Sequence, residues 1–371
     1  MTWVLIAICA VAAIYQLLAL AASLWHALSR APRPSAYPPV SILKPIRGVT
    51  PEILAAIQTH LKQDYPEFEL LLGVREDERA AFDIADPRVR VILCQTVTPN
   101  RKAGSLIDLA AAARHGLVIV NDADISVPQG YVRDIVAALQ PAHIGLVTSV
   151  YRAQGLTWPG RFEGLGVATD FAPSALVAPF VGVSEFGLGS TLAFRRTDLE
   201  RIGGFQAISD FLADDYQLGC KLHALGRRNV IAKPVVSTTL APQDWSAVWR
   251  HQLRWSRTVR LSRAAGYAGL PVTFATFWAS LAMICGLPFV AIGVLAVRLI
   301  SAVTVGYFVL RSTDALRLCF LIPLRDLYSV AVWFAALFGD TVEWGGETLY
   351  LDRRGRIVTK QKSHVRNIDT L

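Results

Sequence analysis

The chain begins with a long uncharged stretch, TWVLIAICAVAAIYQLLALAASLW, at residues 2–25. A transmembrane helix needs about 20 consecutive, mostly apolar residues. A secretory signal peptide would combine a shorter apolar core with a basic segment before it and a small-residue cleavage site after it, and this stretch shows none of these features. Hydrophobic residues make up 53% of the 371 residues, with a mean hydropathy of +0.39, which is high for a soluble enzyme. We therefore predict that residues 1–29 form a retained transmembrane anchor.

The charges near this anchor indicate its orientation. No acid occurs before Glu52, whereas five basic residues do: His26, Arg30, Arg33, Lys44 and Arg47. Basic residues beside a span stay on the cytoplasmic side, so we expect the large middle part of the chain to face the cytoplasm. The net charge of +8 fits attraction to anionic lipid head groups. Because the basic residues lie beside apolar spans, we expect the lipid bilayer and no nucleic acid as a partner.

The middle of the chain alternates short apolar runs with helical patterns. Five apolar runs have the character of buried strands: residues 40–46, 68–74, 89–94, 116–120 and 144–151. Helical patterns lie between most of them, at residues 51–63, 102–114 and 130–140. This alternation predicts an α/β domain with a mainly parallel sheet over residues 38–240. Ligands of such sheets bind beyond the carboxyl ends of the strands. The five cysteines have no metal-ligand spacing, which fits ordinary thiols in a cytoplasmic domain.

Beyond Pro242 the sequence becomes apolar again. Residues 245–263, WSAVWRHQLRWSRTVRLSR, mix tryptophans and aliphatic residues with arginines, which predicts an amphipathic helix at the membrane interface. A surface helix packed on its own domain is the alternative. Residues 274–310 are nearly continuously apolar, and we expect two membrane helices that meet in a turn at residues 286–288. Arg298 would lie inside the second helix and therefore be buried against protein.

A last apolar run, residues 318–338, contains Pro323, Arg325 and Asp326. If it crossed the membrane completely, the basic C-terminal tail (residues 341–371) would lie outside the cell, against the positive-inside preference. We therefore expect residues 270–340 to form a cluster of transmembrane and re-entrant helices.

Two acids one position apart, Asp122 and Asp124, follow the apolar run at residues 116–120. Carboxylates just past a buried strand can hold a divalent cation. Mg²⁺ or Mn²⁺ in this place would neutralise the charge that grows on a diphosphate leaving group. A solvated turn or a helix N-cap is the alternative explanation of this short motif.

A second acidic pair, Asp214 and Asp215, begins a helical pattern in ADDYQLG. The helix dipole favours acids in a first turn in any case. The functional hypothesis is that Asp215 accepts the proton of an acceptor hydroxyl that attacks an anomeric carbon. Lys102, in the helix start NRKAGSL, either contacts phosphate or is a solvated lysine.

Two further segments offer ligand contacts. Glu76 and Asp77, at the end of the second strand, could hydrogen-bond a uracil base or a ribose. Arg254 and Trp255, in HQLRW, could place a cation and a ring against a diphosphate.

Six motifs in order, SILKPIRG, GVRE, NRKAGSL, NDADI, ADDYQLG and HQLRW, resemble those of membrane-bound glycosyltransferases of the family-2 type, which have a GT-A (Rossmann-like) fold. The resemblance covers nearly the whole chain. It is strongest to the ceramide glucosyltransferase group and to bacterial hopanoid-biosynthesis glycosyltransferases. The localisation that it implies is a bacterial inner membrane.

The resemblance also implies roles for individual residues. Glu76 would contact the nucleotide, Asp122 the diphosphate and the metal together with Asp124, and Asp215 would be the catalytic base. Lys102 and Asp214 are expected to bind substrate beside them. His251, Arg254 and Trp255 match an element, Q/R-x-x-R-W, that closes on the donor. Glu76 replaces an aspartate and His251 replaces a glutamine or arginine, so the contacts of these two are the least defined.

The expected reaction is inversion at the anomeric carbon, because one base and one metal-bound leaving group suffice for a direct displacement. A lipid acceptor would explain apolar helices on both sides of the domain. Residues 161–190, rich in small and apolar side chains, either form an acceptor mouth or a plain core helix with a loop. The resemblance favours transfer of N-acetylglucosamine from its UDP donor to a hopanoid polyol, and ceramide with UDP-glucose is second. A processive polysaccharide synthase would need more spans, and a non-catalytic sugar-nucleotide-binding protein would need no base.

Overall fold

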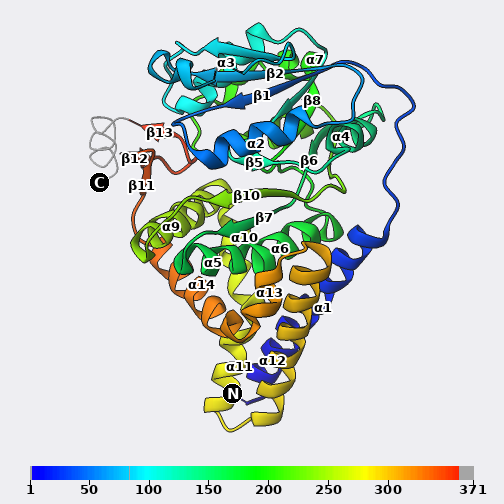
Figure 1. The fold of residues 1–371 in the computed structure, drawn as a ribbon. Helices are drawn as coiled ribbons and strands as arrows, with labels where there is room; N and C mark the ends of the chain where they lie inside the picture. Colours follow the sequence, from blue (N-terminus) through cyan, green and yellow to red (C-terminus); the bar gives the residue numbers. More distant parts are fainter. Residues whose placement is uncertain (1, 83, 359–371) are drawn as a thin grey trace. The chain divides into compact units, whose positions relative to one another are not determined.

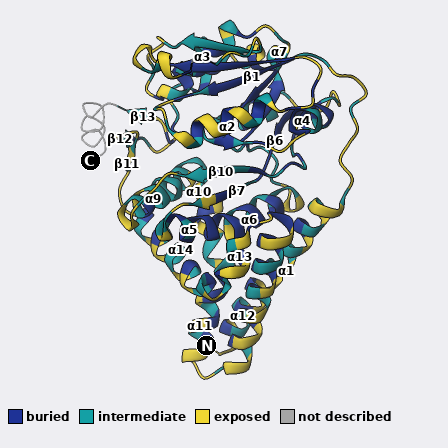
Figure 2. Ribbon diagram, viewed as in Figure 1, coloured by how far each residue is buried: buried dark blue, intermediate teal, exposed yellow. Residues whose placement is uncertain are grey.

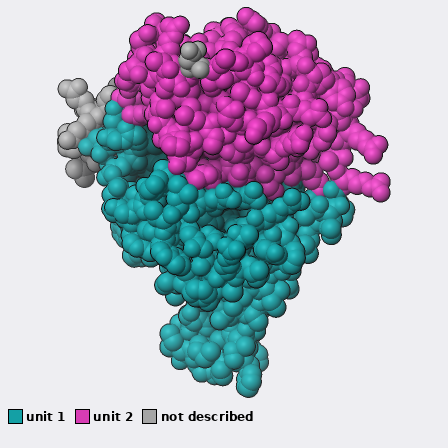
Figure 3. Space-filling view, viewed as in Figure 1, with its two compact units in different colours: residues 1–29, 151–181, 240–354 teal, residues 30–150, 182–239, 355–371 magenta. Residues whose placement is uncertain are grey.

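The computed structural model describes residues 2–82 and 84–358 (Figure 1). The chain divides into two compact units. One unit comprises residues 1–29, 151–181 and 240–354, and we call it the helical unit. The other comprises residues 30–150, 182–239 and 355–371, and we call it the sheet unit (Figure 3). The basic segment KQKSHVR, which the sequence assigns to a C-terminal tail, lies outside the described residues.

A seven-stranded sheet forms the centre of the sheet unit, in the order β3-β2-β1-β4-β8-β6-β9. Its strands are β1 (Val40–Pro45), β2 (Phe68–Val74), β3 (Val89–Leu93), β4 (Leu117–Val120), β6 (Ile144–Thr148), β8 (Leu192–Arg195) and β9 (Arg228–Ile231). Strands β1 to β4 pair in parallel, as do β6 and β9, whereas β8 is antiparallel to both of its neighbours. A short strand, β5 (Ile125–Ser126), pairs with β10 (Val236–Leu240) beside this sheet.

Helices flank the sheet. They are α2 (Pro51–Leu61), α3 (Arg101–Ala112), α4 (Tyr131–Leu139), α7 (Arg196–Arg201) and α8 (Asp214–His223), with short 3-10 turns at Glu76–Phe82 and Phe205–Ile208. All of these helices except α7 lie where the sequence predicted a helical pattern. The start of α3 is fixed by Asn100, whose side-chain oxygen accepts the Ala103 N–H at 3.1 Å. Buried leucines of α3 and α8 pack with Phe194 of β8 in one core. This packing holds the ends of both helices at the edge of the sheet.

The mainly parallel α/β sheet predicted from the sequence is confirmed, and one strand assignment is wrong. Residues 144–151 do not form one strand, because β6 ends at Thr148 and β7 (Tyr151–Gly155) begins in the other unit. The sequence analysis also missed β8, since LAFR is too short to show a period.

The helical unit contains the apolar helices of both ends of the chain. Its longest helices are α1 (Thr2–Leu28), α9 (Trp245–Ser262), α12 (Pro288–Val303) and α14 (Ile322–Ala336). Shorter ones are α10 (Ala264–Gly269), α11 (Ala275–Ile284) and α13 (Thr313–Arg317), and a hairpin of β11 (Thr341–Trp344) and β12 (Glu347–Leu351) follows α14. From α5 (Trp158–Gly166) the chain continues through a π-helical turn (Val167–Phe171) into α6 (Ala172–Val177). Alanines of α1, α11 and α12 pack together, which lets these helices approach closely.

Within residues 2–82 and 84–358, four helices are long and apolar enough to cross a membrane, judged by length and composition: Thr2–Leu28, Trp158–Val181, Pro288–Val309 and Cys319–Ala336. A fifth is possible if the bent pair Ala264–Thr273 and Ala275–Ile284 is one span. Large apolar residues of α1, α11 and α12 are exposed, among them Trp3, Ile284 and Phe289. Exposed residues occur along all three of these helices (Figure 2). Clustered exposed apolar residues mark contact with a membrane or with another protein.

The apolar helices differ in three respects from what the sequence indicated. The run at residues 274–310 turns at Gly286 as predicted, but α11 has only ten residues and is too short to span alone. The last apolar run is not interrupted at Pro323, because this proline lies in the first turn of α14, where a missing N–H costs little. The third candidate helix, Trp158–Val181, was not recognised as a possible span.

Arg298 of α12 is 4% exposed, as the sequence predicted for a charge inside an apolar helix. Its guanidinium donates to both carboxylate oxygens of Asp326, at 2.8 and 2.6 Å. It also donates to the Thr169 carbonyl at 2.7 Å, within the π-helical turn. Arg298 is thus neutralised and held inside the helical unit.

Candidate active site

The main polar cluster of the sheet unit lies just beyond the carboxyl end of β4. Lys102, in the first turn of α3, places its Nζ 2.7 Å from Oδ1 of Asp122 and 3.2 Å from Oδ2 of Asp214. Asp122 comes from the loop after β4, and Asp214 begins α8. One lysine therefore joins two acids that are far apart in the sequence.

Asp215 belongs to the same cluster. Its Oδ2 accepts the Gly189 N–H at 2.8 Å, and its Oδ1 accepts the Tyr216 N–H at 2.7 Å. A Cβ added at Gly189 would lie 2.8 Å from Oδ2 of Asp122 and 3.4 Å from both Oδ2 of Asp215 and Nζ of Lys102. Three charged groups therefore surround one point, and the absence of a side chain at Gly189 leaves that point open.

The charged groups of this cluster shift the pKa values of one another. Burial lowers the pKa of Lys102, but the carboxylates of Asp122, Asp214 and Asp215 outweigh it and raise the pKa above its ordinary value. Burial, followed by the charge of Asp214, raises the pKa of Asp215 to about 6, against the opposing effect of Lys102. A carboxylate with such a pKa is ionised at neutral pH and still basic enough to accept a proton.

Asp124 is turned to a different partner. Its carboxylate accepts a hydrogen bond from the Thr238 hydroxyl of β10 and makes no ion pair with Lys102 among the described residues. Burial, and after it the charge of Asp122, raises the pKa of Asp124, although the Thr238 hydrogen bond acts against this. The two acids of the D-x-D motif therefore have different surroundings, which sequence spacing did not indicate.

Whether a divalent ion fits this site depends on the carboxylates that could bind it. In the part of the chain that the structure describes, no three His, Cys, Asp or Glu side chains converge in the way that a complete protein site for a metal requires. Mg²⁺ sites at phosphates usually take one or two carboxylates from the protein and the remaining ligands from phosphates and water. Asp122 and Asp124 fit that smaller set, and a cation beside them would relieve the cost of the buried Asp124 charge.

Lys44 is a site residue that the sequence analysis quoted in SILKPIRG but did not assign. Its side chain is fully buried, and Nζ donates to the carbonyls of Asp122 and Ile125 at 3.0 and 3.1 Å. It thereby fixes the backbone turn that carries both D-x-D acids. Burial lowers the pKa of Lys44 to about 7, although Asp124 and Asp122 oppose this. A lysine at the end of an otherwise apolar strand was the signal that could have identified it.

Asn121 is a second residue that sequence analysis missed. Its buried side-chain amide donates to the Tyr131 hydroxyl at 2.8 Å and to the Ser190 carbonyl at 2.7 Å. Because Ser190 follows Gly189, these hydrogen bonds hold the loop that contains Gly189 against the end of β4. Buried polar networks of this kind make a local structure unique.

The nucleotide-contact residues predicted at the end of β2 are not joined to this cluster. The Glu76 side chain is exposed and makes no ion pair or hydrogen bond within the described residues. Asp77 pairs with Arg75 at 3.1 Å, and both side chains are exposed. Glu78 instead accepts the Gly48 N–H at 2.6 Å and thus connects the loop after β1 to the end of β2.

The remaining predicted residues lie on α9 of the helical unit. The Nδ1 atom of His251 lies 2.5 Å from a carboxylate oxygen of Glu163, and the His251 ring lies 4.5 Å from the ring of Trp255. His251 and Arg254 line a hollow of about 390 Å³ between α9 and the β11–β12 hairpin.

Helix α9 was predicted to lie at the membrane interface, but two of its arginines contact backbone carbonyls of the same unit. Arg257 donates to the carbonyls of Thr341 and Phe338, and Arg260 to that of Gly339. This part of α9 is therefore packed on its own unit, as in the alternative interpretation.

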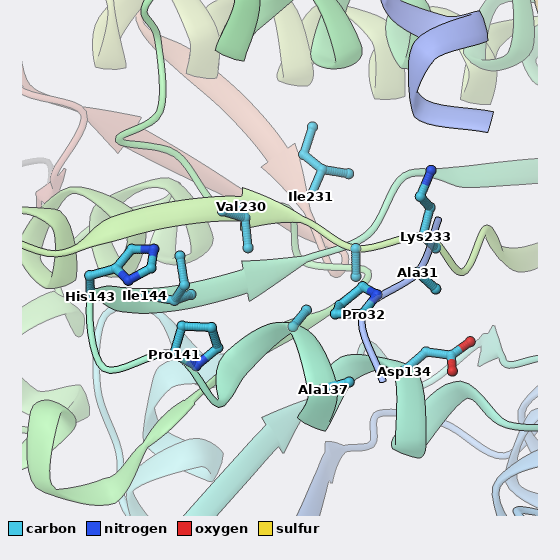
Figure 4. Close-up of a pocket in the computed structure, with 12 residues that line it drawn as sticks. Ala31, Pro32, Asp134, Ala137, Pro141, His143, Ile144, Val230, Ile231 and Lys233 are labelled. Carbon is cyan, nitrogen blue, oxygen red and sulfur yellow. The ribbon is translucent and has the colours of Figure 1, made fainter. Parts of the chain in front are cut away.

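A separate cavity of about 240 Å³ lies in the sheet unit (Figure 4). Its walls are mainly apolar and come from α4, β9 and the segment that contains Pro32, with Asp134, His143 and Lys233 at its polar positions. None of the predicted site residues lines it, so it is distinct from the carboxylate cluster.

Known proteins are similar to this chain in sequence and in fold. Residues 4–357 match the model of Glycosyl transferase family 21. Ceramide glucosyltransferase 1 of Caenorhabditis elegans is 25% identical over 57% of this chain, but the match spans only 46% of that relative. Ceramide glucosyltransferase 3 of the same organism is 22% identical over 92% of this chain and 79% of the relative.

Among solved structures, a mannosyltransferase from Pyrobaculum calidifontis in complex with GDP-Man and Mn²⁺ has a TM-score of 0.53 and 22% identity. The alignment covers 90% of this chain and 97% of that chain. This similarity supports a GT-A-like α/β fold with a mainly parallel central sheet. With a family match over nearly its whole length, the chain belongs to glycosyl transferase family 21.

Proposed function

We propose that this protein transfers a sugar from a UDP-sugar to a hydroxyl group of a membrane lipid, with inversion at the anomeric carbon. The observation that carries the proposal is the meeting of Lys102, Asp122 and Asp215 around the open position at Gly189. This arrangement offers a cation, a metal-binding carboxylate and a base within one small space at the end of a parallel sheet.

In the proposed reaction, Asp215 accepts the proton of the lipid hydroxyl while the hydroxyl oxygen forms a bond to the anomeric carbon. The bond between that carbon and the diphosphate oxygen breaks, and its electron pair leaves with UDP. The raised pKa of Asp215, about 6, suits this proton transfer at neutral pH. The Gly189 and Tyr216 N–H groups orient its carboxylate.

Lys102 is proposed to contact the diphosphate as a fixed cation, held in place by Asp122 and Asp214. A bound Mg²⁺ or Mn²⁺ would supply neutralisation of the leaving group, with Asp122 and Asp124 as its protein ligands. Glu76 at the nucleotide, and His251, Arg254 and Trp255 at the donor, complete the proposal through the resemblance of their motifs.

A lipid acceptor is supported by the long apolar helices and their exposed apolar side chains. We propose that residues 38–240 form the catalytic domain on the cytoplasmic side, because basic residues follow the N-terminal helix. For the substrates, the sequence motifs favour N-acetylglucosamine and a hopanoid polyol. The names of the two Caenorhabditis relatives favour the second candidate, glucose transfer to ceramide.

The test is direct. Purified protein in lipid nanodiscs is incubated with UDP-N-acetylglucosamine or UDP-glucose and with a hopanoid polyol or ceramide, and the lipid products are identified by mass spectrometry. The proposal expects a glycolipid and stoichiometric UDP with at least one donor and acceptor pair. UDP release without any glycosylated lipid would contradict it.

A further inference from the structure

Glu163 is a buried carboxylate in α5 that no part of the proposed reaction uses. Its side chain is 1% exposed. One oxygen, Oε2, accepts a hydrogen bond from Gln243 at 2.6 Å. The other, Oε1, accepts one from Gln252 at 2.9 Å and lies 2.5 Å from Nδ1 of His251. Because an ionised carboxylate can only accept hydrogen bonds, Nδ1 of His251 carries a hydrogen.

These contacts reach the first two residues of the motif HQLRW directly and its last residue through His251. His251 is the first residue of the motif, and its ring lies against that of Trp255, the last residue, with 4.5 Å between ring centres. The ring centre of Trp255 also lies 5.8 Å from that of Phe171. Phe171 follows Glu163 in the same continuous helical segment. Gln252 accepts a further hydrogen bond from Arg325 of α14 at 2.9 Å. Glu163 is thus the common partner of two adjacent residues of the motif.

Glu163 is not needed to attach α9 as a whole. The N-terminus of α9 is capped by Asp244, which accepts the Ala247 N–H at 2.7 Å. Its C-terminal half is held by Arg257 and Arg260 through backbone carbonyls. Loss of the Glu163 carboxylate would therefore loosen α9 around His251 and Trp255 and leave its two ends in place.

We propose that Glu163 is a positioning residue that fixes the orientation of His251 and, through it, of Trp255. This inference rests on the proposed function, in which the HQLRW element acts on the sugar donor. A buried acid is costly unless it is fully hydrogen-bonded, and Glu163 meets that requirement with side chains of α9 and of the segment just before it. The same hydrogen bonds hold the side chains of the motif in one defined arrangement.

The test is the variant Glu163→Gln, which keeps the size of the side chain but removes its negative charge and one of its two acceptor oxygens. We expect the KM for the UDP-sugar to rise by about tenfold or more, the size expected for a lost hydrogen bond to a charged group, with the KM for the lipid unchanged. Hydrogen–deuterium exchange is expected to increase in residues 249–256 and not in residues 257–262. Asp314→Asn is the matched control, because it removes the ion pair of Arg161, which holds the same helix α5 to α13 at 2.7 Å.

The α9 side of the contact gives a second test that leaves Glu163 in place. His251→Gln keeps a hydrogen-bond donor and is expected to lose less activity than His251→Ala. The double variant Glu163→Gln with His251→Ala should be little worse than either single variant, because both remove one shared interaction.

Three outcomes would overturn the inference: unchanged donor KM in Glu163→Gln, the same change in Asp314→Asn, or additive effects in the double variant. If the wild type transfers no sugar at all, the proposed function fails by itself. The exchange measurement still decides the inference in that case, because unchanged protection of residues 249–256 in Glu163→Gln contradicts it.

Discussion

The backbone N–H of Gly189 donates a hydrogen bond to Oδ2 of Asp215 at 2.8 Å. Gly189 lies in the loop before β8, and Asp215 lies in the first turn of α8. The loop therefore approaches the proposed base closely enough to orient it, while the missing side chain leaves space beside Asp122. The geometry of the cluster depends on this one backbone contact and on the buried amide of Asn121 that holds the loop.

Gly189→Ala should abolish most of the activity without unfolding the protein. The added Cβ would lie 2.8 Å from Oδ2 of Asp122, so this carboxylate must move. Displacing a reacting group by about 1 Å costs on the order of 100-fold in rate. The measurement is the initial rate of glycolipid formation together with the melting temperature. Gly116→Ala, whose Cβ meets nothing within 4 Å, is the control and should retain the wild-type rate.

Asp215→Asn should eliminate sugar transfer and leave binding of the UDP-sugar nearly unchanged. An asparagine still accepts one backbone N–H but cannot take the acceptor's proton. Calorimetric titration with the donor, together with product detection by mass spectrometry, separates the two effects. Asp210→Asn, at an exposed position just before α8, is the control. Substantial turnover by Asp215→Asn would show that the base is a different group.

The rate should fall on the acid side of about pH 6. Burial and the charge of Asp214 raise the pKa of Asp215 to about 6, and protonation removes the base. Below that value kcat/KM should decrease about tenfold for each pH unit, and above it the rate should level off. Asp214→Asn removes a charge that raises this pKa, so the acid limb should move to lower pH. An acid limb that stays in place or moves to higher pH in this variant would disprove the assignment.

Transfer should require Mg²⁺ or Mn²⁺. The carboxylates of Asp122 and Asp124 can supply part of a coordination sphere that donor phosphates complete. Excess chelator should stop product formation, and added Mn²⁺ should restore it. Thr238→Val removes the hydrogen bond that holds Asp124 and is expected to raise the metal concentration needed for half-maximal rate. Full turnover in chelator would eliminate the metal role.

Asp326→Asn should strongly destabilise the helical unit. Arg298 is nearly completely buried, and this change leaves its guanidinium without the anionic partner at 2.6 Å. Breaking a buried ion pair on one side costs about 3–5 kcal/mol. Thermal unfolding in detergent would show a lower melting temperature. The comparison is Asp77→Asn, whose pair with Arg75 is exposed and should contribute about 0–1 kcal/mol. Equal effects of both variants would contradict the prediction.

Local sequence patterns were sufficient for the elements that carry most of the cluster. Residues 40–46, 68–74 and 116–120 are apolar on both sides of a strand, so they predicted β1, β2 and β4 of a parallel sheet. Acids that directly follow such a run must lie at the carboxyl edge, which placed Asp122 correctly. The same reasoning gave no partner for Lys44, because its burial depends on the carbonyls of a turn that forms only in the folded chain.

Long apolar helices, a mainly parallel sheet and acids beyond its strand ends can all be predicted from this sequence, because these features follow from hydrophobic period and segment length. Which of the acids meet depends on the packing of the folded chain. The insertion of β8 beside β4 brings Gly189 to Asp215 and Asp122, whereas Asp124 turns to Thr238. Likewise, α5 buries Glu163 against His251. Such contacts join residues far apart in the chain, and their geometry is set by packing, which no local pattern records.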